Sequence, residues 1–489
     1  MAASRGRRGC GHSVARMGRQ TGVSRLFGTD GVRGVANVPP LTPELALSIG
    51  RAVAQRLREV NTAKPRVLIG RDTRLSGSML ESAVAAGVCS AGGDVLRAGV
   101  LPTPGVAYCT REMAADAGVV ISASHNPFQD NGIKVFSRDG FKLPDAEEDR
   151  IEELVFSAVT DPPTGPELGT VTELGDALER YVAFCCRTLP SSDLAGLHLV
   201  LDCANGATHL AAPAVFSALG ARVSVLGDQP DGVNINEGCG SEHPEVLISR
   251  VRELGAQVGL ALDGDGDRLR VVDERGALLT GDQVMAICAQ MYQERGWLDH
   301  DLVVTTVMSN FGLAVALRGL GIEHAASKVG DRYVLELMRE RGAVLGGEDS
   351  GHIIFLRHHT TGDGIIAALQ VLGAMRFYGR PLSTLAQVMR VTPQRIINVD
   401  VASKPSIGSL QTLSDAIAAA EEELGDDGRV LVRYSGTQAM CRVMVEGPSQ
   451  EMTDRLAACL AGAIREEIGA RSGAAGAVDA GTASPGDLN

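Results

Sequence analysis

The sequence predicts an α/β protein built from three similar α/β units and a smaller C-terminal α+β unit. The chain has 489 residues, which at roughly 150 residues per domain corresponds to about three or four domains. Short apolar stretches alternate with helical stretches, and this alternation restarts twice along the chain. Glycine is frequent, at 59 residues, and because it follows no collagen period it indicates many tight turns and close backbone approaches.

The first unit is expected to open with a helix near residue 42. Thr42 and Pro43 supply an N-cap and a first helical turn. The apolar side chains that follow recur at helical spacing, at Leu45, Ile49, Val53 and Leu57. The next expected elements are a strand at Val67–Ile69, a turn at Gly70–Arg74, a helix around Met79–Cys89 and strands at Val95–Leu96 and Val119–Ser122.

The later units follow in the same way. The second has expected strands at Leu197–Asp202, Val223–Leu226 and Val258–Leu262, with helices at 208–219 and 245–254. The third has strands at Leu302–Val307 and Val344–Leu345, with helices at Leu313–Gly319, Tyr333–Arg341 and Gly364–Met375. The fourth differs in its order, with strands at Gln394–Val401, Gly428–Arg433 and Arg442–Val445 and one strong helix at Ser409–Leu424. We therefore expect the fourth unit to be a small α+β cap. The three earlier units are similar in their order of elements, but no clean sequence repeat relates them.

Composition excludes several classes of protein. With 44% hydrophobic and 21% charged residues, the chain is not mostly disordered. Its net charge of -13 argues against sequence-independent nucleic-acid binding, and an anionic small substrate would need a local basic cleft. No stretch approaches the ~18 apolar residues of a membrane span. The ten cysteines form no CxxC pair, which is typical of reduced thiols, so we expect a soluble protein of the cytoplasm.

Both ends are expected to lie outside the fold, as a flexible extension over 1–23 and a disordered tail over 469–489. Residues 1–25 carry six arginines and no acidic residue, and they lack the apolar core of a secretory signal. An Arg-rich transit peptide fits this composition, and so does an extension ahead of a start at Met17. The tail is mostly Gly, Ala, Ser and Asp, which cannot bury enough surface to order it.

Polar clusters follow the predicted strands, where ligands bind in α/β sheets. The first cluster is Ile121–Pro127, in which the Ser124 hydroxyl beside His125 is suited to act as a nucleophile or a phosphate carrier. Plain turn chemistry accounts for the same Ser, Asn and Pro residues. This cluster alone therefore leaves both interpretations open.

The second cluster, Leu262–Arg268, has three carboxylates at alternate positions between glycines: Asp263, Asp265 and Asp267. Such carboxylates can converge on one hard divalent cation and leave positions open for a phosphate. A calcium EF-hand is rejected because Arg268 stands where that loop requires glycine. A phosphatase with an aspartate nucleophile has a similar string, but that interpretation leaves Ser124 without a role.

Two further clusters offer binding groups. The third, Gly346–His352, has donors and acceptors suited to sugar hydroxyls, and an ordinary acidic loop is its alternative interpretation. Its candidate side chains are Glu348, Ser350 and His352. The fourth, Arg433–Gln438 with Arg442 beyond it, combines arginine, hydroxyls and glycine as a phosphate monoester requires. Other basic candidates in glycine-rich turns are Arg33, Arg71, Arg74, Lys134 and Lys328.

In this order the clusters resemble the motifs of the α-D-phosphohexomutase superfamily, and they are most similar to those of the bacterial phosphoglucosamine mutases within it. The matching segments are FGTDGVRG, ISASHNPFQDNGIK, LDGDGDR, GGEDSGH and RYSGT. The resemblance runs from about Ser24 to about Ile468, and it implies three similar α/β domains with mixed sheets and a C-terminal α+β cap domain around a central cleft. The expected domains are 24–190 with the phosphoserine loop, 191–300 with the metal loop, 301–390 with the sugar-binding loop and 391–468 with the phosphate-binding loop.

The resemblance also implies a role for each candidate residue. Ser124 would be the phosphoserine and would bind Mg²⁺ together with Asp263, Asp265 and Asp267. The implied catalytic residues are Ser124, Arg33, Lys134, Arg268 and His352. The implied substrate-binding residues are Lys328, Glu348, Ser350, Arg433, Ser435, Gly436, Thr437 and Arg442. Lys134 is the candidate proton shuttle, and burial beside arginine is expected to lower its pKa toward neutrality.

The implied activity is that of an isomerase, an intramolecular phosphotransferase acting between glucosamine 6-phosphate and glucosamine 1-phosphate. A glucosamine 1,6-bisphosphate would be its intermediate and activator, and its product would feed UDP-N-acetylglucosamine and cell-wall precursor synthesis. The implied partners are small hexosamine phosphates, with no nucleic acid or membrane, and the chain would be a monomer or a homodimer. The alternatives are a phosphoglucomutase or phosphomannomutase, a metal-dependent phosphatase and a catalytically silent sugar-phosphate sensor.

Three positions depart from the family pattern. Gln438 stands in place of Glu and is followed by Ala439 in place of Pro, while Asp349 replaces a frequent Gln. These changes bear on the position of the cap domain and on affinity. They leave Ser124 and the three metal carboxylates unchanged.

Overall fold

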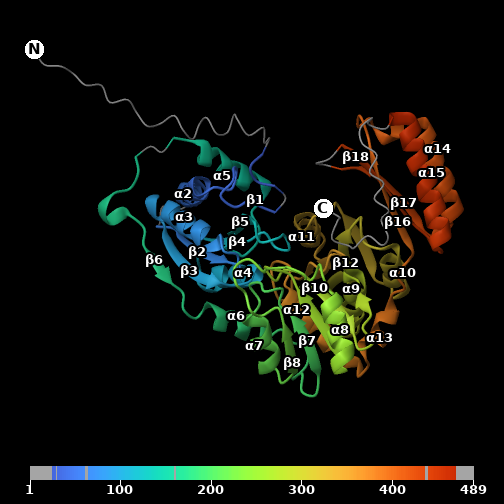
Figure 1. Ribbon diagram of the computed structural model, residues 1–489, viewed down its shortest axis with the longest axis horizontal. Helices are drawn as coiled ribbons and strands as arrows, with labels where there is room; N and C mark the ends of the chain where they lie inside the picture. The colour runs from blue at the N-terminus through green and yellow to red at the C-terminus, as the bar shows by residue number, and fades with distance from the viewer. Residues whose placement is uncertain (1–24, 29, 61–63, 159–160, 436–438, 470–489) are drawn as a thin grey trace, which may run out of the picture.

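The computed structural model describes residues 25–28, 30–60, 64–158, 161–435 and 439–469. The predicted extension over 1–23 and the predicted tail, apart from Gly469, lie outside these residues, as do Gly436, Thr437 and Gln438. Within the described ranges, four sheets follow one another along the chain, coloured from blue to red in Figure 1. Three α/β units with mixed sheets followed by an α+β cap are therefore confirmed.

The first sheet has six strands in the order β1-β5-β4-β2-β3-β6. They are β1 (Val32–Val35), β2 (Arg66–Arg71), β3 (Asp94–Val100), β4 (Ala117–Ile121), β5 (Asp130–Ser137) and β6 (Val171–Glu173). The sheet is mixed, because β2 runs parallel to β3 and β4 whereas β5 is antiparallel to β1 and β4. The helices of this unit are α2 (Pro43–Val60), α3 (Gly77–Ser90), α4 (Thr103–Glu112), α5 (Asp145–Phe156) and α6 (Ala177–Cys186).

Helices α2 and α3 approach each other closely at two glycines. A Cβ at Gly50 would lie 2.1 Å from the carbonyl oxygen of Val84, and one at Gly87 would lie 2.0 Å from the carbonyl oxygen of Leu47. Any larger residue at either position would push the two backbones apart. The apolar faces of both helices join the strands of the first sheet in one core.

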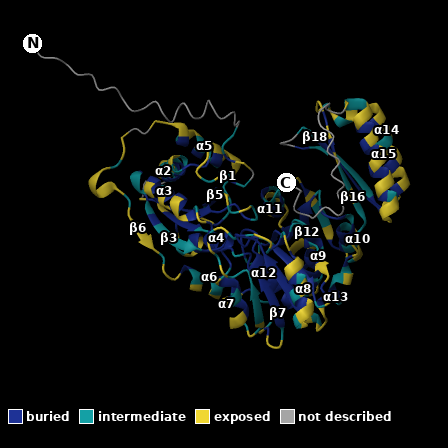
Figure 2. Ribbon diagram, in the orientation of Figure 1, coloured by how far each residue is buried: buried dark blue, intermediate teal, exposed yellow. Residues whose placement is uncertain are grey.

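The second and third sheets have the orders β11-β10-β9-β7-β8 and β13-β12-β14-β15, and each is mixed. Their strands are β7 (His198–Asp202), β8 (Arg222–Leu226), β9 (Val258–Leu262), β10 (Leu269–Asp273), β11 (Leu278–Leu279), β12 (Leu302–Thr306), β13 (Glu323–Ser327), β14 (Leu345–Gly347) and β15 (Ile353–Phe355). Their helices are α7 (Ala211–Ala218), α8 (Glu245–Leu254), α9 (Gly281–Glu294), α10 (Phe311–Gly319), α11 (Asp331–Arg341), α12 (Gly364–Tyr378) and α13 (Leu382–Leu385). One large core runs through the first three units, and α12, dark blue in Figure 2, lies within it.

The fourth sheet is a small antiparallel one in the order β16-β18-β17. It consists of β16 (Gln394–Asp400), β17 (Arg429–Tyr434) and β18 (Met440–Glu446), covered by α14 (Gln411–Leu424) and α15 (Gln450–Ile468). Its apolar residues form a separate core. Figure 1 shows this cap, in orange and red, at one side of the molecule and beside α10 of the third unit.

The structure corrects the sequence prediction in several places. The expected turn at Gly70–Arg74 begins too early, because Gly70 and Arg71 belong to β2, which pairs with a strand on each side. Thirteen helices and strands were not predicted at all: β1, α4, β5, α5, β6, α6, β10, β11, α9, β13, β15, α13 and α15. For α4 and α9 the reason is burial, since most of their residues are enclosed and no polar face marks a helical period. The predicted domain boundaries stay predictions.

No helix in the described part of the chain is long and apolar enough to cross a lipid bilayer. The nine cysteines that lie in the described ranges are free thiols, as their spacing predicts. Most of them are buried or half-buried, and burial raises the pKa of several, to about 12 for Cys109 and Cys239.

Candidate active site

The loops that follow β4, β9 and β14 meet in one place, as expected for the carboxyl ends of strands. Ser124 follows β4, and its hydroxyl donates to Oδ2 of Asp263, which follows β9, at 2.5 Å. His352, which ends the loop after β14, places Nδ1 3.5 Å from Oδ2 of Asp267. All four side chains are buried. The structure therefore brings together the first three sequence clusters.

Ser124 stands in a strained backbone conformation that its neighbours hold in place. Its φ is 52°, in the left-handed region that residues other than glycine seldom occupy. The amide of Asn236 donates to the carbonyl oxygens of Ser124 and Asn126, both at 3.0 Å. Arg74, buried and paired with Asp72, donates to the same two carbonyls. Arg74 was a candidate for substrate contact, and the structure instead places it beneath the serine loop.

The three aspartates after β9 form a compact buried group. One carboxylate oxygen of each lies within 4.8 Å of the others, and Oδ1 of Asp265 and of Asp267 has no hydrogen-bond partner among the described residues. Burial, followed by the charges of Asp267 and Asp265, raises the pKa of Asp263 well above its usual value. Oxygen donors at this spacing suit a hard divalent cation, which would balance their repulsion. The residues present thus fit Mg²⁺.

Glycines allow the metal loop to approach the serine loop. A Cβ at Gly264 would lie 2.6 Å from the carbonyl oxygen of Ser124, and Gly266 has a φ of 77°. Gly264 is therefore required by a close backbone contact, and Gly266 is required by its left-handed backbone conformation.

Lys134, on β5, is buried between two carboxylates. Its Nζ lies 3.0 Å from Oδ2 of Asp265 and 2.9 Å from Oδ2 of Asp30. Burial alone would lower the pKa of Lys134, but Asp265 and Asp30 outweigh it and the pKa is raised. The expected lowering of this pKa is wrong, because carboxylates and not arginines face the amine most closely.

Asp30 also starts a chain of alternating charges that joins the three α/β units. Lys142 contacts Asp30 and lies 2.5 Å from Oδ2 of Asp331, at the start of α11. Asp331 lies 3.6 Å from Nε2 of His352, whose other nitrogen faces Asp267. Burial lowers the pKa of His352, but the two aspartates outweigh it, so the pKa is raised and the imidazolium is favoured. With the two contacts of Lys134, these pairs run from Asp265 to Asp267, and the metal loop that carries both aspartates completes the ring.

Two arginines complete the positive side of the site. Arg33 is paired with Asp30. Arg268 lies 4.0 Å from Asp267 and also lines the neighbouring cavity. Arg71, another sequence candidate, instead pairs with a glutamate of α3.

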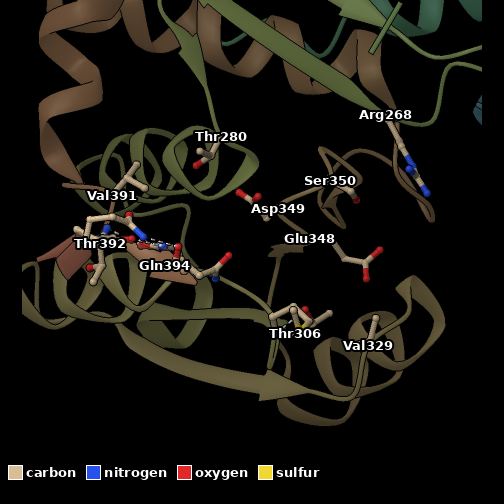
Figure 3. Close-up of a pocket in the computed structure, with 14 residues that line it drawn as sticks. Arg268, Thr280, Thr306, Val329, Glu348, Asp349, Ser350, Val391, Thr392 and Gln394 are labelled. Carbon is tan, nitrogen blue, oxygen red and sulfur yellow. Dashed lines mark hydrogen bonds between the residues drawn. The ribbon is translucent and has the colours of Figure 1, made fainter. Parts of the chain in front are cut away.

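The loop Gly346–His352 lines a cavity of about 420 Å³. Figure 3 shows Glu348 and Ser350 of this loop around the cavity with Arg268. Oε1 of Glu348 accepts from the backbone N–H of Gly330 at 3.1 Å, and Oγ of Ser350 is buried without a hydrogen-bond partner among the described residues. Burial raises the pKa of Glu348. The cavity therefore offers hydrogen-bonding groups for a polar ligand.

The candidate Lys328 and the family departure Asp349 are engaged elsewhere. Nζ of Lys328 lies 5.9 Å from the ring centroid of Tyr333 and does not line the cavity. The carboxylate of Asp349 accepts from the backbone N–H of Asp282, at the start of α9, at 3.3 Å. A negative charge is favourable at a helix N-terminus, so the family departure at Asp349 is consistent with anchoring the loop to this helix.

The cap carries the remaining candidates. Arg433 of β17 and Arg442 of β18 are directly opposite each other, and neither has a carboxylate within 4.0 Å among the described residues. Burial and Arg442 lower the pKa of Arg433, as expected for two adjacent cations without an anion. Nη2 of Arg433 lies 3.9 Å from the sulfur of Met308, in the third unit, and Ser435, which follows β17, is buried. This pair of cations lies in a separate unit from the aspartate group, and Met308, which Arg433 contacts, lines the cavity beside Glu348.

Four profiles match the chain in order, each described as phosphoglucomutase/phosphomannomutase: alpha/beta/alpha domain I over 24–161, domain II over 178–276, domain III over 280–391 and the C-terminal domain over 396–463. A phosphoglucosamine mutase of Syntrophus aciditrophicus is 56% identical over 450 residues, 91% of this chain and 100% of its own length. The chain belongs to the phosphoglucomutase/phosphomannomutase family. A phosphoglucosamine mutase of Syntrophobacter fumaroxidans is 53% identical over 91% of the chain and 100% of its own length.

Solved structures of this family have the same fold. A phosphoglucomutase/phosphomannomutase family protein from Burkholderia thailandensis matches with a TM-score of 0.77 and 25% identity, over 90% of this chain and 97% of its own. An N-acetylphosphoglucosamine mutase of Aspergillus fumigatus was solved in complex with GlcNAc-6P and magnesium. It matches with a TM-score of 0.64 and 16% identity, over 93% of this chain and 98% of its own. At this identity the second match bears on the fold alone.

Sequence reasoning about this phosphohexomutase missed three charged residues of the ring: Asp30, Lys142 and Asp331. Asp30 and Asp331 lie inside segments that were singled out, but only the basic residues of those segments were given roles. Lys142 lies in no motif, and its partner Asp331 is 189 positions away in sequence. No local pattern could have revealed that contact.

Proposed function

We propose that this chain is a phosphoglucosamine mutase, which interconverts glucosamine 6-phosphate and glucosamine 1-phosphate through a phosphoserine at Ser124 and a glucosamine 1,6-bisphosphate. The observation that carries the proposal is the 2.5 Å contact between the Ser124 hydroxyl and Asp263 of a buried aspartate group. The relatives named phosphoglucosamine mutase that are at least half identical support the choice of substrate. We also propose that the enzyme acts in the cytoplasm on small hexosamine phosphates.

Asp263, Asp265 and Asp267 would hold Mg²⁺ together with the phosphate on Ser124. The ion would neutralise part of the charge that spreads over the phosphoryl oxygens in the transition state. The left-handed backbone of Ser124, fixed by Asn236 and Arg74, presents the hydroxyl to this group of carboxylates.

The chemistry of the protein itself is electrostatic. The bond from Ser124 Oγ to phosphorus breaks as a sugar hydroxyl forms its own bond to phosphorus, and the proton of that hydroxyl passes, with Lys134 as the shuttle, to the leaving Ser124 Oγ. The bisphosphate later returns its other phosphoryl group to Ser124, with the proton moving in the opposite direction. Arg33, Lys134 and Arg268 are positive groups beside this serine and stabilise the charge of the moving group. Because its pKa is raised, Lys134 begins as a proton donor to phosphoryl oxygen. Before Lys134 can accept a proton, it must first donate one to Asp265 or Asp30, its carboxylate partners.

Substrate contacts would come from two units. Glu348, Ser350 and His352 bind sugar hydroxyls, with Lys328 turning inward from its place over Tyr333. Arg433, Ser435 and Arg442, with Gly436 and Thr437 of the same loop, grip the phosphate that does not react. One phosphate site of this kind lets a single cleft accept both isomers in opposite orientations.

The test is turnover of the purified enzyme with Mg²⁺ on the 6-phosphates of glucosamine, glucose and mannose, with inorganic phosphate measured in parallel. We expect the glucosamine phosphate to give the highest kcat/KM and phosphate release to stay negligible. A preference for glucose or mannose phosphate would leave a mutase with another substrate, and steady phosphate release would indicate a phosphatase. Binding without any turnover would indicate a sugar-phosphate sensor.

A further inference from the structure

A second cavity, of about 630 Å³, lies apart from the candidate active site. It forms where the ends of α4, β5 and α6 meet the turn that follows β15. Four arginines line it: Arg111, Arg138, Arg187 and Arg357. The carboxylates on its wall are those of Glu112 and Asp139, so cations predominate here although the whole chain has a net charge of -13.

Three of these arginines have no anionic partner in the described part of the chain. Arg111, Arg138 and Arg187 are exposed and lie more than 4.0 Å from any described carboxylate, whereas Arg357 lies 2.9 Å from Asp299. Guanidinium groups that share a cavity without pairing to its carboxylates repel one another, and phosphate oxygens relieve that repulsion through paired hydrogen bonds. The wall is therefore suited to a polyanion.

The shape of the site favours a small molecule. Its volume falls within the range of about 300–1,000 Å³ that is typical of small-ligand pockets. Tyr108 and Phe184 line the same cavity and stack with ring centroids 4.1 Å apart, which gives part of the wall a fixed apolar surface. One monophosphate needs one or two arginines, whereas cations on four separate segments match a ligand that carries two linked phosphates.

Helix α4 connects this cavity to the metal loop. Its first residue, Thr103, donates from Oγ1 to Oδ2 of Asp265 at 2.7 Å and from its backbone N–H to the carbonyl of Asp265 at 2.9 Å. Its last turn carries Arg111 and Glu112 of the cavity wall. Ten residues of helix span about 15 Å. The two sites are therefore distinct, and they lie at opposite ends of one buried helix.

We propose that this cavity is a second anion site, which binds a small ligand carrying a diphosphate group. The ligand contacts Arg111 and Arg138 from the domain I match and Arg357 from the domain III match, so it bridges two domains on the side of α4 remote from Asp265. The proposal does not depend on which sugar phosphate the active site converts.

The test is calorimetric titration of the full-length chain with inorganic pyrophosphate and, separately, inorganic phosphate, with free Mg²⁺ held equal in all solutions. The test variant is Arg111→Gln/Arg138→Gln. Arg433→Gln reports binding at the candidate active site, and Arg150→Gln/Arg250→Gln removes the same charge from exposed positions elsewhere. Arg111, Arg138 and Arg150 are exposed and the side chain of Arg250 is 42% exposed, so we expect the double variants to fold.

We expect the wild-type chain to bind pyrophosphate more tightly than phosphate. The Arg111→Gln/Arg138→Gln variant should weaken pyrophosphate binding at least about tenfold, because two charge-assisted contacts are lost. Arg433→Gln and the distant double variant should each leave this component unchanged. An equal loss in the distant double variant, or loss only in Arg433→Gln, would overturn the proposal, as would absence of any component that depends on Arg111 and Arg138. Equal affinity for phosphate and pyrophosphate would overturn the diphosphate class.

Discussion

At the scale of single residues, the ionised carboxylate of Asp263 is destabilised by its surroundings. It is fully buried, and burial together with Asp267 and Asp265 raises its pKa well above the usual value, so the charged form is disfavoured without a cation. Asp263→Asn should therefore raise the Tm of the Mg²⁺-free protein by about one degree, the shift that about 1 kcal/mol gives a chain of this length. It should also abolish the rise in Tm that Mg²⁺ gives the wild type and lower kcat by about 10²-fold or more.

Thermal unfolding with and without Mg²⁺, and turnover on glucosamine 6-phosphate, measure these effects. Asp415→Asn, an exposed carboxylate on α14, is the control and should change none of them. A variant that still gains stability from Mg²⁺ as the wild type does would remove Asp263 from the cation site.

Single residues also mark the limit of what the sequence can predict about the site. Ser124 and the three aspartates were found because each lies in a short local pattern at a strand end. The contacts of Lys134 and Lys142 were not found, since they join residues more than a hundred positions apart. For that reason the pKa of Lys134 was predicted in the wrong direction. Electrostatic environments depend on tertiary neighbours that a local motif does not include.

At the scale of elements, the contact between α2 and α3 depends on glycine. Gly50→Ala would place a Cβ 2.1 Å from the carbonyl oxygen of Val84, a backbone atom that cannot turn aside. We expect a loss of about 1–3 kcal/mol of unfolding free energy from overpacking, measured by urea denaturation. Gly462→Ala on α15 is the matched control, because nothing lies within 4 Å of its Cβ and helix propensity alone predicts a gain of up to about 1 kcal/mol. Equal effects at the two positions would contradict the packing account.

The start of α12 should make stability depend on pH. Asp363 caps this helix, accepting from the Ile366 N–H at 2.9 Å, and burial raises its pKa to about 7. The folded state thus binds a proton more tightly than the unfolded state, so this group's contribution is greatest in acid and is lost as pH rises from about 4 to 7. The loss is at most about 4 kcal/mol, from three pH units of about 1.4 kcal/mol each.

Asp363→Asn keeps an N-capping side chain but cannot ionise. Denaturation of both proteins between pH 4 and 8 should show the wild type losing stability relative to the variant as pH rises. A constant difference across this range would mean that Asp363 does not titrate there.

The elements that were predicted match the structure within a few residues, whereas the amphipathic helix α15 was not predicted. Helix α8 and strand β9 match their predicted bounds fully. Helix α4 was missed because eight of its ten residues are buried, and a helix enclosed on all sides has no polar stripe. The connection that it makes between the metal loop and the second cavity was consequently also missed.

At the scale of the whole molecule, a buried carboxylate of the cap contacts the third unit. Glu446 accepts from Nδ2 of Asn310 at 2.9 Å and from the N–H of Phe311 at 3.1 Å, and it is paired with Arg429 of the cap. This joint sets where the cap holds Arg433. Glu446→Ala should raise the KM for both glucosamine phosphates by about tenfold, the effect of losing 1.4 kcal/mol of binding, and should change kcat less.

Steady-state kinetics in both directions measure this split. Glu423→Ala, which removes an exposed ion pair within the cap, is the control and should leave KM unchanged. A fall in kcat with an unchanged KM would show that the joint does not position the phosphate-binding residues.

The central claim is that Ser124 carries the phosphoryl group that is exchanged with the sugar. The most direct measurement is a single turnover: the phosphorylated enzyme is mapped by peptide mass spectrometry, mixed with glucosamine 6-phosphate and Mg²⁺, and mapped again with the sugar products. We predict that phosphate begins on Ser124, appears in glucosamine 1,6-bisphosphate and then returns as glucosamine 1-phosphate forms, while Ser124→Ala forms neither. Normal turnover by Ser124→Ala, or phosphate that stays on Ser124 while product forms, would contradict the account.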